Sequence, residues 1–261
     1  MKYGCHAVMF AAKLATDMET VTREIGTTGF AGIECGNRFI SLENRDRLMD
    51  LLRQNGLELA AIHYAFMDWR TDPRAGIEGL KAEAAYMAKT PNKNINMSFM
   101  PTPDDDADKL VTTFEEAAKA AAEFGVSLNY HNHLAEFAND GVFVYKLLEN
   151  APHLNFAYDL GWVRRAGFDP IKLLKDSEGR CNYVHLRDPK TEKAQAYTLE
   201  AMRALPPFPE FGTGETNLQE QIDFLQGYLN EQGWAIVEHE GGEPDINRYI
   251  KAKAVLDSLI R

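Results

Sequence analysis

The chain is poor in the features that mark extracellular, membrane or nucleic-acid-binding proteins. It has three cysteines in 261 residues, an odd and widely spaced set that is typical of reduced core residues rather than of a disulfide framework. No stretch approaches the roughly 18 consecutive apolar residues of a membrane-spanning helix. It has no basic run, and its formal charge of -11 disfavours binding to a phosphate backbone or an anionic lipid surface. We therefore expect a cytoplasmic protein that has neither nucleic acid nor membrane as a partner.

The first residues contain a short apolar stretch that lacks the organisation of a secretion signal. His6 interrupts this stretch and Lys13 follows it closely, whereas a signal peptide needs an unbroken apolar segment. We expect the first strand here, over residues 3–10.

Short apolar runs alternate with polar segments of helical period along the whole chain. Eight runs are expected to be strands, at residues 3–10, 32–35, 57–63, 95–100, 127–131, 154–158, 183–186 and 234–237. Helix ends are marked between them, for example by Asn55-Gly56 after a helix expected over residues 42–54. Near-continuous apolar strands separated by helices indicate a parallel sheet covered by helices.

Two folds share this alternation, the closed (β/α)8 TIM barrel and the open doubly wound sheet. The open sheet usually carries a glycine-rich phosphate turn after its first strand, and residues 9–20 contain no glycine. A length of 261 residues with 45% hydrophobic residues also suits one barrel. We predict an α/β protein with a single TIM barrel domain over residues 1–261. The proline-containing stretch 190–217 is expected to be a long loop on the face where barrels hold active sites.

Polar residues stand at or just beyond the C-terminal ends of several expected strands. They are Glu136, Asp159, His185 and Glu238, in the contexts YHNHLAEF, FAYDLGW, YVHLRD and AIVEHE. The C-terminal ends of all strands meet at one face of a barrel, and carboxylate and imidazole groups bind divalent cations. These four residues are a predicted site for one divalent metal, with Mn²⁺, Mg²⁺, Co²⁺ and Zn²⁺ equally compatible.

Further polar residues near the same strand ends are candidates for contact with a substrate. His63 closes the third strand, Glu34 ends the second, and His133 shares a strand face with His131 by two-residue alternation. Each has a structural alternative, because a strand-end carboxylate is more often an ion-pair partner and a histidine can be a hydrogen-bonded interior residue.

Four motifs follow one another in the order found in a known family. They are YHNHLAEF (residues 130–137), DLGWVRRAGFDP (159–170), HLRD (185–188) and WAIVEHE (234–240). Through them the chain resembles the xylose isomerase-like barrels, which include sugar isomerases and epimerases, inosose dehydratase and the apurinic endonucleases. The resemblance covers essentially the whole chain and implies a barrel whose open end holds one metal bound by Glu, Asp, His and Glu.

Three of these implied ligands have clear counterparts, and the first glutamate has two candidates. Asp159, His185 and Glu238 match the family positions. Many relatives carry a glutamate inside the fifth strand, where this chain has His131, whereas relatives with the YHNH pattern use the glutamate that follows, here Glu136. We take Glu136 as the ligand and keep His131 as the alternative.

Two departures from the family pattern concern the pocket. The family motif often reads Asp-x-Gly-His, and this chain has Trp162 at the last position, which argues against the multi-metal endonucleases. Arg187 replaces the commoner lysine of His-x-Lys-Asp, so a permanently charged fork stands in place of a titratable amine. We expect Arg187, Trp162, His63, His131 and Glu34 to contact the substrate.

The resemblance implies a metal-dependent isomerase or epimerase that acts on a small ketose or keto-sugar through a cis-enediolate. A cation chelated by the carbonyl and its neighbouring hydroxyl acidifies the adjacent C–H, and Glu136, Glu238 or His133 would move the proton. A lyase of the inosose dehydratase type, or one acting on a 3-keto-glycoside, would use the same enolate and lose a hydroxyl. An apurinic endonuclease-like hydrolase and a non-catalytic sugar-binding barrel are less favoured. A homo-oligomer is compatible with all of these.

Overall fold

The computed structural model describes residues 1–177, 179–190 and 192–260, and within these ranges eight strands form a closed parallel barrel in chain order. The strands are β1 (Lys2–His6), β2 (Gly32–Gly36), β3 (Glu58–Tyr64), β4 (Asn94–Ser98), β5 (Ser127–His131), β6 (Asn155–Asp159), β7 (Tyr183–Leu186) and β8 (Trp234–Val237). Strand β8 pairs with β1 and so closes the barrel. The predicted TIM barrel is confirmed.

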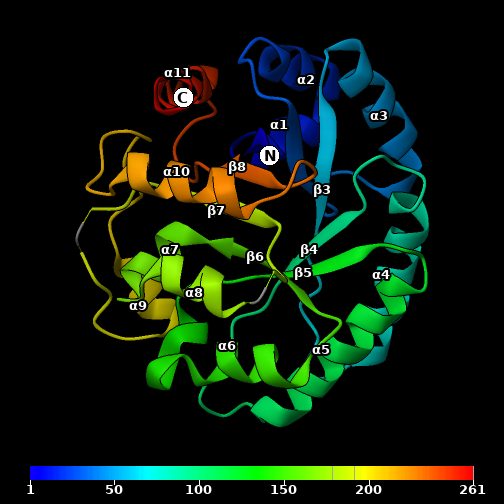
Figure 1. The fold of residues 1–261 in the computed structure, drawn as a ribbon. Coiled ribbons are helices and arrows are strands. Elements are labelled where there is room, and N and C mark those ends of the chain that lie inside the picture. Colours follow the sequence, from blue (N-terminus) through cyan, green and yellow to red (C-terminus); the bar gives the residue numbers. More distant parts are fainter. Residues whose placement is uncertain (178, 191, 261) are drawn as a thin grey trace.

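Helices surround the strands on the outside of the barrel (Figure 1). They are α1 (Ala11–Thr16), α2 (Met18–Gly26), α3 (Arg45–Gln54), α4 (Pro73–Met87), α5 (Ala107–Ala122), α6 (Ala138–Asn150), α7 (Leu160–Arg165), α8 (Pro170–Asp176), α9 (Leu199–Ala204), α10 (Leu218–Tyr228) and α11 (Ile246–Leu259). In the described ranges, no helix has both the length and the apolarity that crossing a membrane requires.

Acidic caps and glycines set the helix ends, and Asn55-Gly56 ends a helix as expected. Asp72 accepts a hydrogen bond from the backbone N–H of Ala75 at the start of α4, and Asp106 accepts one from Lys109 at the start of α5. Gly56 has a φ of 69° just after α3, a backbone conformation that side chains disfavour. These local signals fix where the chain turns back towards the barrel.

The first strand is shorter than the expected 3–10. Strand β1 ends at His6, because the Nδ1 atom of His6 accepts a hydrogen bond of 3.0 Å from the backbone N–H of Val8. This bond turns the chain into a short 3-10 helix, η1 (Ala7–Phe10). The turn leaves His6 at the C-terminal end of its strand, beside the corresponding end of β2.

Large side chains fill the barrel near the N-terminal ends of its strands. Trp234, Tyr183 and Ile236 pack there as fully buried residues. Gly32 makes room for the indole, since a Cβ atom at this position would lie 2.8 Å from the Trp234 ring and 2.5 Å from the Glu58 carbonyl oxygen. This end of the barrel is therefore closed, and polar residues gather at the other end.

Candidate active site

Four potential metal ligands meet at the C-terminal end of the barrel. They are His131 at the end of β5, Asp159 at the end of β6, His185 on β7 and Glu238 just beyond β8, and all four are buried. One ligand atom from each lies within 4.8 Å of the others. The strand register explains the meeting, because Asp159 pairs with His185 on neighbouring strands. Two imidazoles and two carboxylates are a donor set that suits Mn²⁺, Mg²⁺, Co²⁺ or Zn²⁺.

His131 has the free nitrogen that a metal ligand needs. Its Nδ1 atom is buried and has no hydrogen-bond partner among the described residues. Burial and the neighbouring His185 lower the pKa of His131 well below its usual value, so the ring is neutral and keeps a lone pair. A buried polar atom without a partner costs free energy, and binding to a cation would remove that cost. The group therefore fits a divalent metal by chemistry as well as by spacing.

Glu136 lies outside this group. It is part of the 3-10 helix η3 (Ala135–Phe137), five residues beyond the end of β5, and it is fully buried. Its Oε1 atom accepts hydrogen bonds from the backbone N–H of His133 at 3.1 Å and from the Tyr130 hydroxyl at 3.3 Å. Burial raises the pKa of Glu136 to about 8. The structure thus brings His131 to the cluster and places Glu136 against the backbone of the loop that carries His133.

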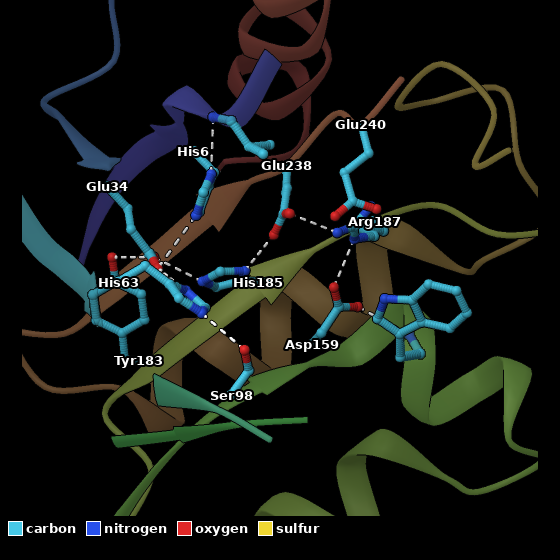
Figure 2. Close-up of polar contacts among 12 residues, drawn as sticks. His6, Glu34, His63, Ser98, Asp159, Tyr183, His185, Arg187, Glu238 and Glu240 are labelled. Carbon is cyan, nitrogen blue, oxygen red and sulfur yellow. Dashed lines mark hydrogen bonds and ion pairs between the residues drawn. The ribbon is translucent and has the colours of Figure 1, made fainter. Parts of the chain in front are cut away.

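Arg187 links three carboxylates at the edge of the cluster (Figure 2). Its Nε atom donates to Asp159 at 2.6 Å, its Nη2 atom pairs with Glu238 at 2.7 Å, and its Nη1 atom donates to Glu240 at 3.1 Å. Burial opposes the ionisation of Glu238, but the charge of Arg187 and the nearby histidines hold the pKa of this carboxyl well below its usual value. Burial raises the pKa of Asp159 in spite of Arg187. The guanidinium is thus the main counter-charge of the site.

Glu34 is the centre of a second buried network, on the other side of His185 (Figure 2). Its Oε2 atom lies 2.8 Å from His185 Nε2 and accepts a 2.8 Å hydrogen bond from the Tyr183 hydroxyl. Its Oε1 atom lies 3.0 Å from His63 Nδ1 and 3.5 Å from His6 Nε2. Burial opposes its ionisation, yet the charges of and hydrogen bonds from His185 and His6 hold the pKa of Glu34 well below its usual value.

This network determines which nitrogen of His185 can face a metal. Because Glu34 is an ionised acceptor, the Nε2 atom of His185 carries a proton towards it, and Nδ1 is left facing Glu238 at 2.6 Å. A carboxylate behind the histidine commonly orients metal-binding imidazoles in this way. The two carboxylates raise the pKa of His185 to about 10 against the effect of burial, and a cation on Nδ1 would take the place of that proton.

His6, Glu34 and His63 are close enough to form a second metal site, but the hydrogen bonds favour a different role. His6 Nδ1 already accepts the N–H of Val8, so its proton is on Nε2, the nitrogen that faces Glu34. A protonated nitrogen cannot be a metal ligand. We therefore interpret this cluster as a hydrogen-bonded support for the first one.

Two adjoining cavities open at this end of the barrel. A cavity of about 150 Å³ is lined by His6, His63, His131, Glu238 and Glu240. A second cavity of about 390 Å³ has mainly apolar walls, including Phe66, Met67, Phe99, Pro101 and Leu199. Ser98 and His133 line both cavities. Of the residues expected to touch substrate, His63 and His131 line the smaller cavity, and His133 is at the junction.

Trp162, Glu34 and Arg187 are placed behind this surface rather than along it. The backbone N–H of Trp162 donates to Asp159 at 2.9 Å, and its ring meets Phe208 edge to face. Glu34 and Arg187 are buried by their partners. Ser98 is a site residue that sequence reasoning missed; its only signal is its place at the end of β4.

Asp188 anchors the loop that follows β7. Its Oδ2 atom accepts hydrogen bonds from the backbone N–H groups of Gly212 at 3.0 Å and Gly214 at 2.7 Å, and Oδ1 accepts one from Thr216 at 3.1 Å. Gly214 is required here, because a Cβ atom would lie 2.0 Å from the Asp188 carbonyl oxygen. The loop is therefore fixed to the residue next to Arg187.

The sequence matches the family model described as xylose isomerase-like TIM barrel over residues 22–259. The chain belongs to the xylose isomerase-like TIM barrel family. Two family relatives are inosose dehydratases: that of Mesomycoplasma hyopneumoniae is 25% identical over 90% of this chain and 85% of its own length. That of Geobacillus kaustophilus is 27% identical over 60% of this chain, which spans 53% of that protein.

Two solved structures share the whole fold at low sequence identity. A sugar phosphate isomerase/epimerase from Parabacteroides distasonis superposes with a TM-score of 0.79 at 16% identity, covering 100% of this chain and 97% of that one. A xylose isomerase-like protein from Mycobacterium smegmatis, in complex with magnesium, gives 0.75 at 13% identity, covering 99% and 96%. These likenesses support the barrel, and the chemistry depends on the residues of this chain.

Proposed function

We propose that this xylose isomerase-like barrel is a divalent-metal-dependent isomerase or epimerase of a small ketose or keto-sugar. The observation that carries the proposal is the group His131, Asp159, His185 and Glu238, whose ligand atoms lie within 4.8 Å of one another. The small cavity next to it is lined by His131 and Glu238. A solved relative in complex with magnesium and others named as epimerases agree with this chemistry.

His131, Asp159, His185 and Glu238 would hold the metal, and Glu136 would not. A bound cation supplies Lewis-acid polarisation of a substrate carbonyl, which acidifies the adjacent C–H. The arrangement around the ligands supports this role, because Glu34 orients His185 and Arg187 orients Asp159 and Glu238. Such supporting contacts are typical of metal sites.

Glu238 and His133 are the residues we assign to proton transfer. Arg187 keeps Glu238 ionised, so this carboxylate can accept a proton from the carbon next to the carbonyl. Burial lowers the pKa of His133 to about 3, so its neutral ring can accept or relay a proton at the junction of the cavities. Return of the proton to the neighbouring carbon gives an isomer, and return to the opposite face of the same carbon gives an epimer.

Dehydration is the second candidate, because the two sequence relatives described above are named inosose dehydratases. It begins with the same removal of a proton from the carbon next to the carbonyl, and then a β-hydroxyl leaves as water. Glu240, which is partly exposed beside Arg187 and lines the small cavity, is the group that could protonate that hydroxyl.

A screen for deuterium exchange tests both candidates. The protein is incubated in heavy water with Mg²⁺ and a panel of ketoses, keto-cyclitols and 3-keto-glycosides, and the products are followed by proton NMR. We expect deuterium at a carbon next to the carbonyl of at least one substrate, with a new isomer or an unsaturated product identifying the reaction. A metal-loaded protein that exchanges no such hydrogen across the panel would contradict the proposal.

Replacing Glu136 with glutamine (Glu136→Gln) is expected to make the folding stability less dependent on pH. In the folded protein the Glu136 carboxyl has a pKa of about 8, above its ordinary value. The contribution of this group to the free energy of unfolding is therefore complete below about pH 4.5 and is lost as the pH rises through 8. This pKa shift corresponds to a change of about 4–5 kcal/mol in the free energy of unfolding across that pH range. We expect urea denaturation to show the wild type losing stability relative to Glu136→Gln between pH 5 and 9. Parallel curves would contradict this.

The Glu136→Gln variant also tests whether Glu136 or His131 is the metal ligand. In isothermal titration calorimetry we expect Glu136→Gln to keep its affinity for Mg²⁺ and His131→Ala to bind Mg²⁺ about 10- to 100-fold more weakly, or weaker still. Loss of affinity in Glu136→Gln with retention in His131→Ala would reverse the assignment.

A further inference from the structure

Three side chains outside the metal ligands form a continuous chain of hydrogen bonds (Figure 2). The Oγ atom of Ser98 lies 3.1 Å from His63 Nε2, and His63 Nδ1 lies 3.0 Å from Glu34 Oε1. The three residues come from three consecutive strands, β2, β3 and β4. A hydroxyl, an imidazole and a buried carboxylate in this order are the arrangement that activates a serine for nucleophilic attack.

The proton positions in this chain follow from its neighbours. Glu34 is fully buried, and its other oxygen receives the Tyr183 hydroxyl and faces His185. The Ser98 hydroxyl can donate to His63 Nε2 when the ring hydrogen is on Nδ1, and Nδ1 is the nitrogen that faces Glu34 Oε1. Glu34 is thus placed to hold His63 in the tautomer that can remove the proton of the serine hydroxyl.

Ser98 stands where the two cavities meet. The smaller cavity has a mixed lining in which the polar side chains of His6, His63 and Glu240 lie beside apolar ones, and the larger cavity is mainly apolar, with Phe66 and Phe99 among its walls. A substrate bridging both would have a polar, hydroxyl-bearing part and an apolar part, with the bond between them at Ser98. A sugar esterified with an apolar acyl group has this form.

We propose that Ser98, His63 and Glu34 form an esterase site for O-acyl sugars, a second activity that needs no metal. Ser98 Oγ forms a bond to the acyl carbon while His63 Nε2 takes its proton. The bond from this carbon to the sugar oxygen then breaks, and the same proton goes to that oxygen. Water next attacks the acyl-serine, His63 takes a proton from the water, and Ser98 leaves with that proton as the acid is released. Glu34 positions His63, and the ring N–H of His133 is the donor that we assign to the carbonyl oxygen.

The test uses the full chain with a fluorophosphonate probe and with p-nitrophenyl butyrate, both in the presence of EDTA. We expect one phosphonyl adduct, mapped by mass spectrometry to Ser98, and ester hydrolysis that falls at least about a hundredfold in Ser98→Ala and in His63→Gln. His153→Gln is the matched control, because His153 Nδ1 also pairs with a glutamate, Glu115 at 2.6 Å, but His153 is exposed and lines neither cavity. This control should keep its labelling and its rate.

Each contrary result overturns the proposal. No labelling, labelling at a different residue, or an unchanged rate in Ser98→Ala would exclude a nucleophilic serine. Hydrolysis that EDTA abolishes and Mg²⁺ restores would assign ester cleavage to the metal group instead. Failure of the deuterium-exchange screen would leave these results unaffected, because the serine site is assayed without metal.

Discussion

Glutamine in place of Glu238 is expected to lower the rate of deuterium exchange by about a thousandfold or more. The substitution removes one ligand of the proposed metal and the carboxylate assigned to proton transfer, and each loss alone typically costs about 10- to 1,000-fold or more. It also takes the negative charge away from Arg187, which pairs with this carboxylate at 2.7 Å. The two losses act on the same step, so their effects are not simply additive.

Glu231→Gln is the matched control for this experiment. Glu231 is exposed and precedes β8, whereas Glu238 follows it, so the same chemical change is made at the closed end of the barrel. We expect wild-type exchange in this control. A Glu238→Gln protein that binds Mg²⁺ and exchanges at the wild-type rate would refute the role of this carboxylate.

Methionine in place of Arg187 is expected to destabilise the metal-free protein by about 3–5 kcal/mol. The guanidinium is fully buried and contacts the carboxylates of Asp159, Glu238 and Glu240. Without it, the buried carboxylates of Asp159 and Glu238 remain close together and lose the one cation that pairs with both of them among the described residues. Urea denaturation in the presence of EDTA measures the loss.

Magnesium should reduce the loss of stability in Arg187→Met relative to the wild type, because a dication at the proposed site would restore positive charge beside Asp159 and Glu238. Arg53→Met is the control, since Arg53 pairs with Asp50 on the surface with both side chains mostly exposed, and such pairs contribute about 0–1 kcal/mol. If Arg187→Met were as stable as the wild type in EDTA, these carboxylates would have another source of stabilisation.

The barrel could be predicted because its pattern is repeated eight times along the chain. Every expected strand corresponds to a strand of the barrel, although the first ends at His6 instead of residue 10. The error has a local cause, since a side-chain nitrogen accepting the N–H of Val8 ends a run that stays apolar. The spacing of hydrophobic residues in the sequence contains no information about a side-chain hydrogen bond of this kind, so it cannot predict where the strand ends.

The meeting of the candidate residues was predictable where a residue sits on a strand and uncertain where it sits on a loop. Asp159 and His185 are strand residues, and Glu238 directly follows one, so counting along the strand places them together. Glu136 lies beyond β5 on a 3-10 turn, where the direction of a side chain cannot be obtained from two-residue alternation. Ser98 went unpredicted because a single serine has no spacing of its own and acquires significance only beside His63.

The Asp188 anchor bears on how a barrel of this kind can change its substrate. All three hydrogen bonds to this carboxylate come from main-chain N–H groups, so they constrain the path of the loop and place few demands on its side chains. A mutation at the exposed Thr213 can therefore alter the rim while the main-chain anchor beside Arg187 is kept. The rim can then vary during evolution without passing through forms that have lost the arrangement of the proposed metal ligands.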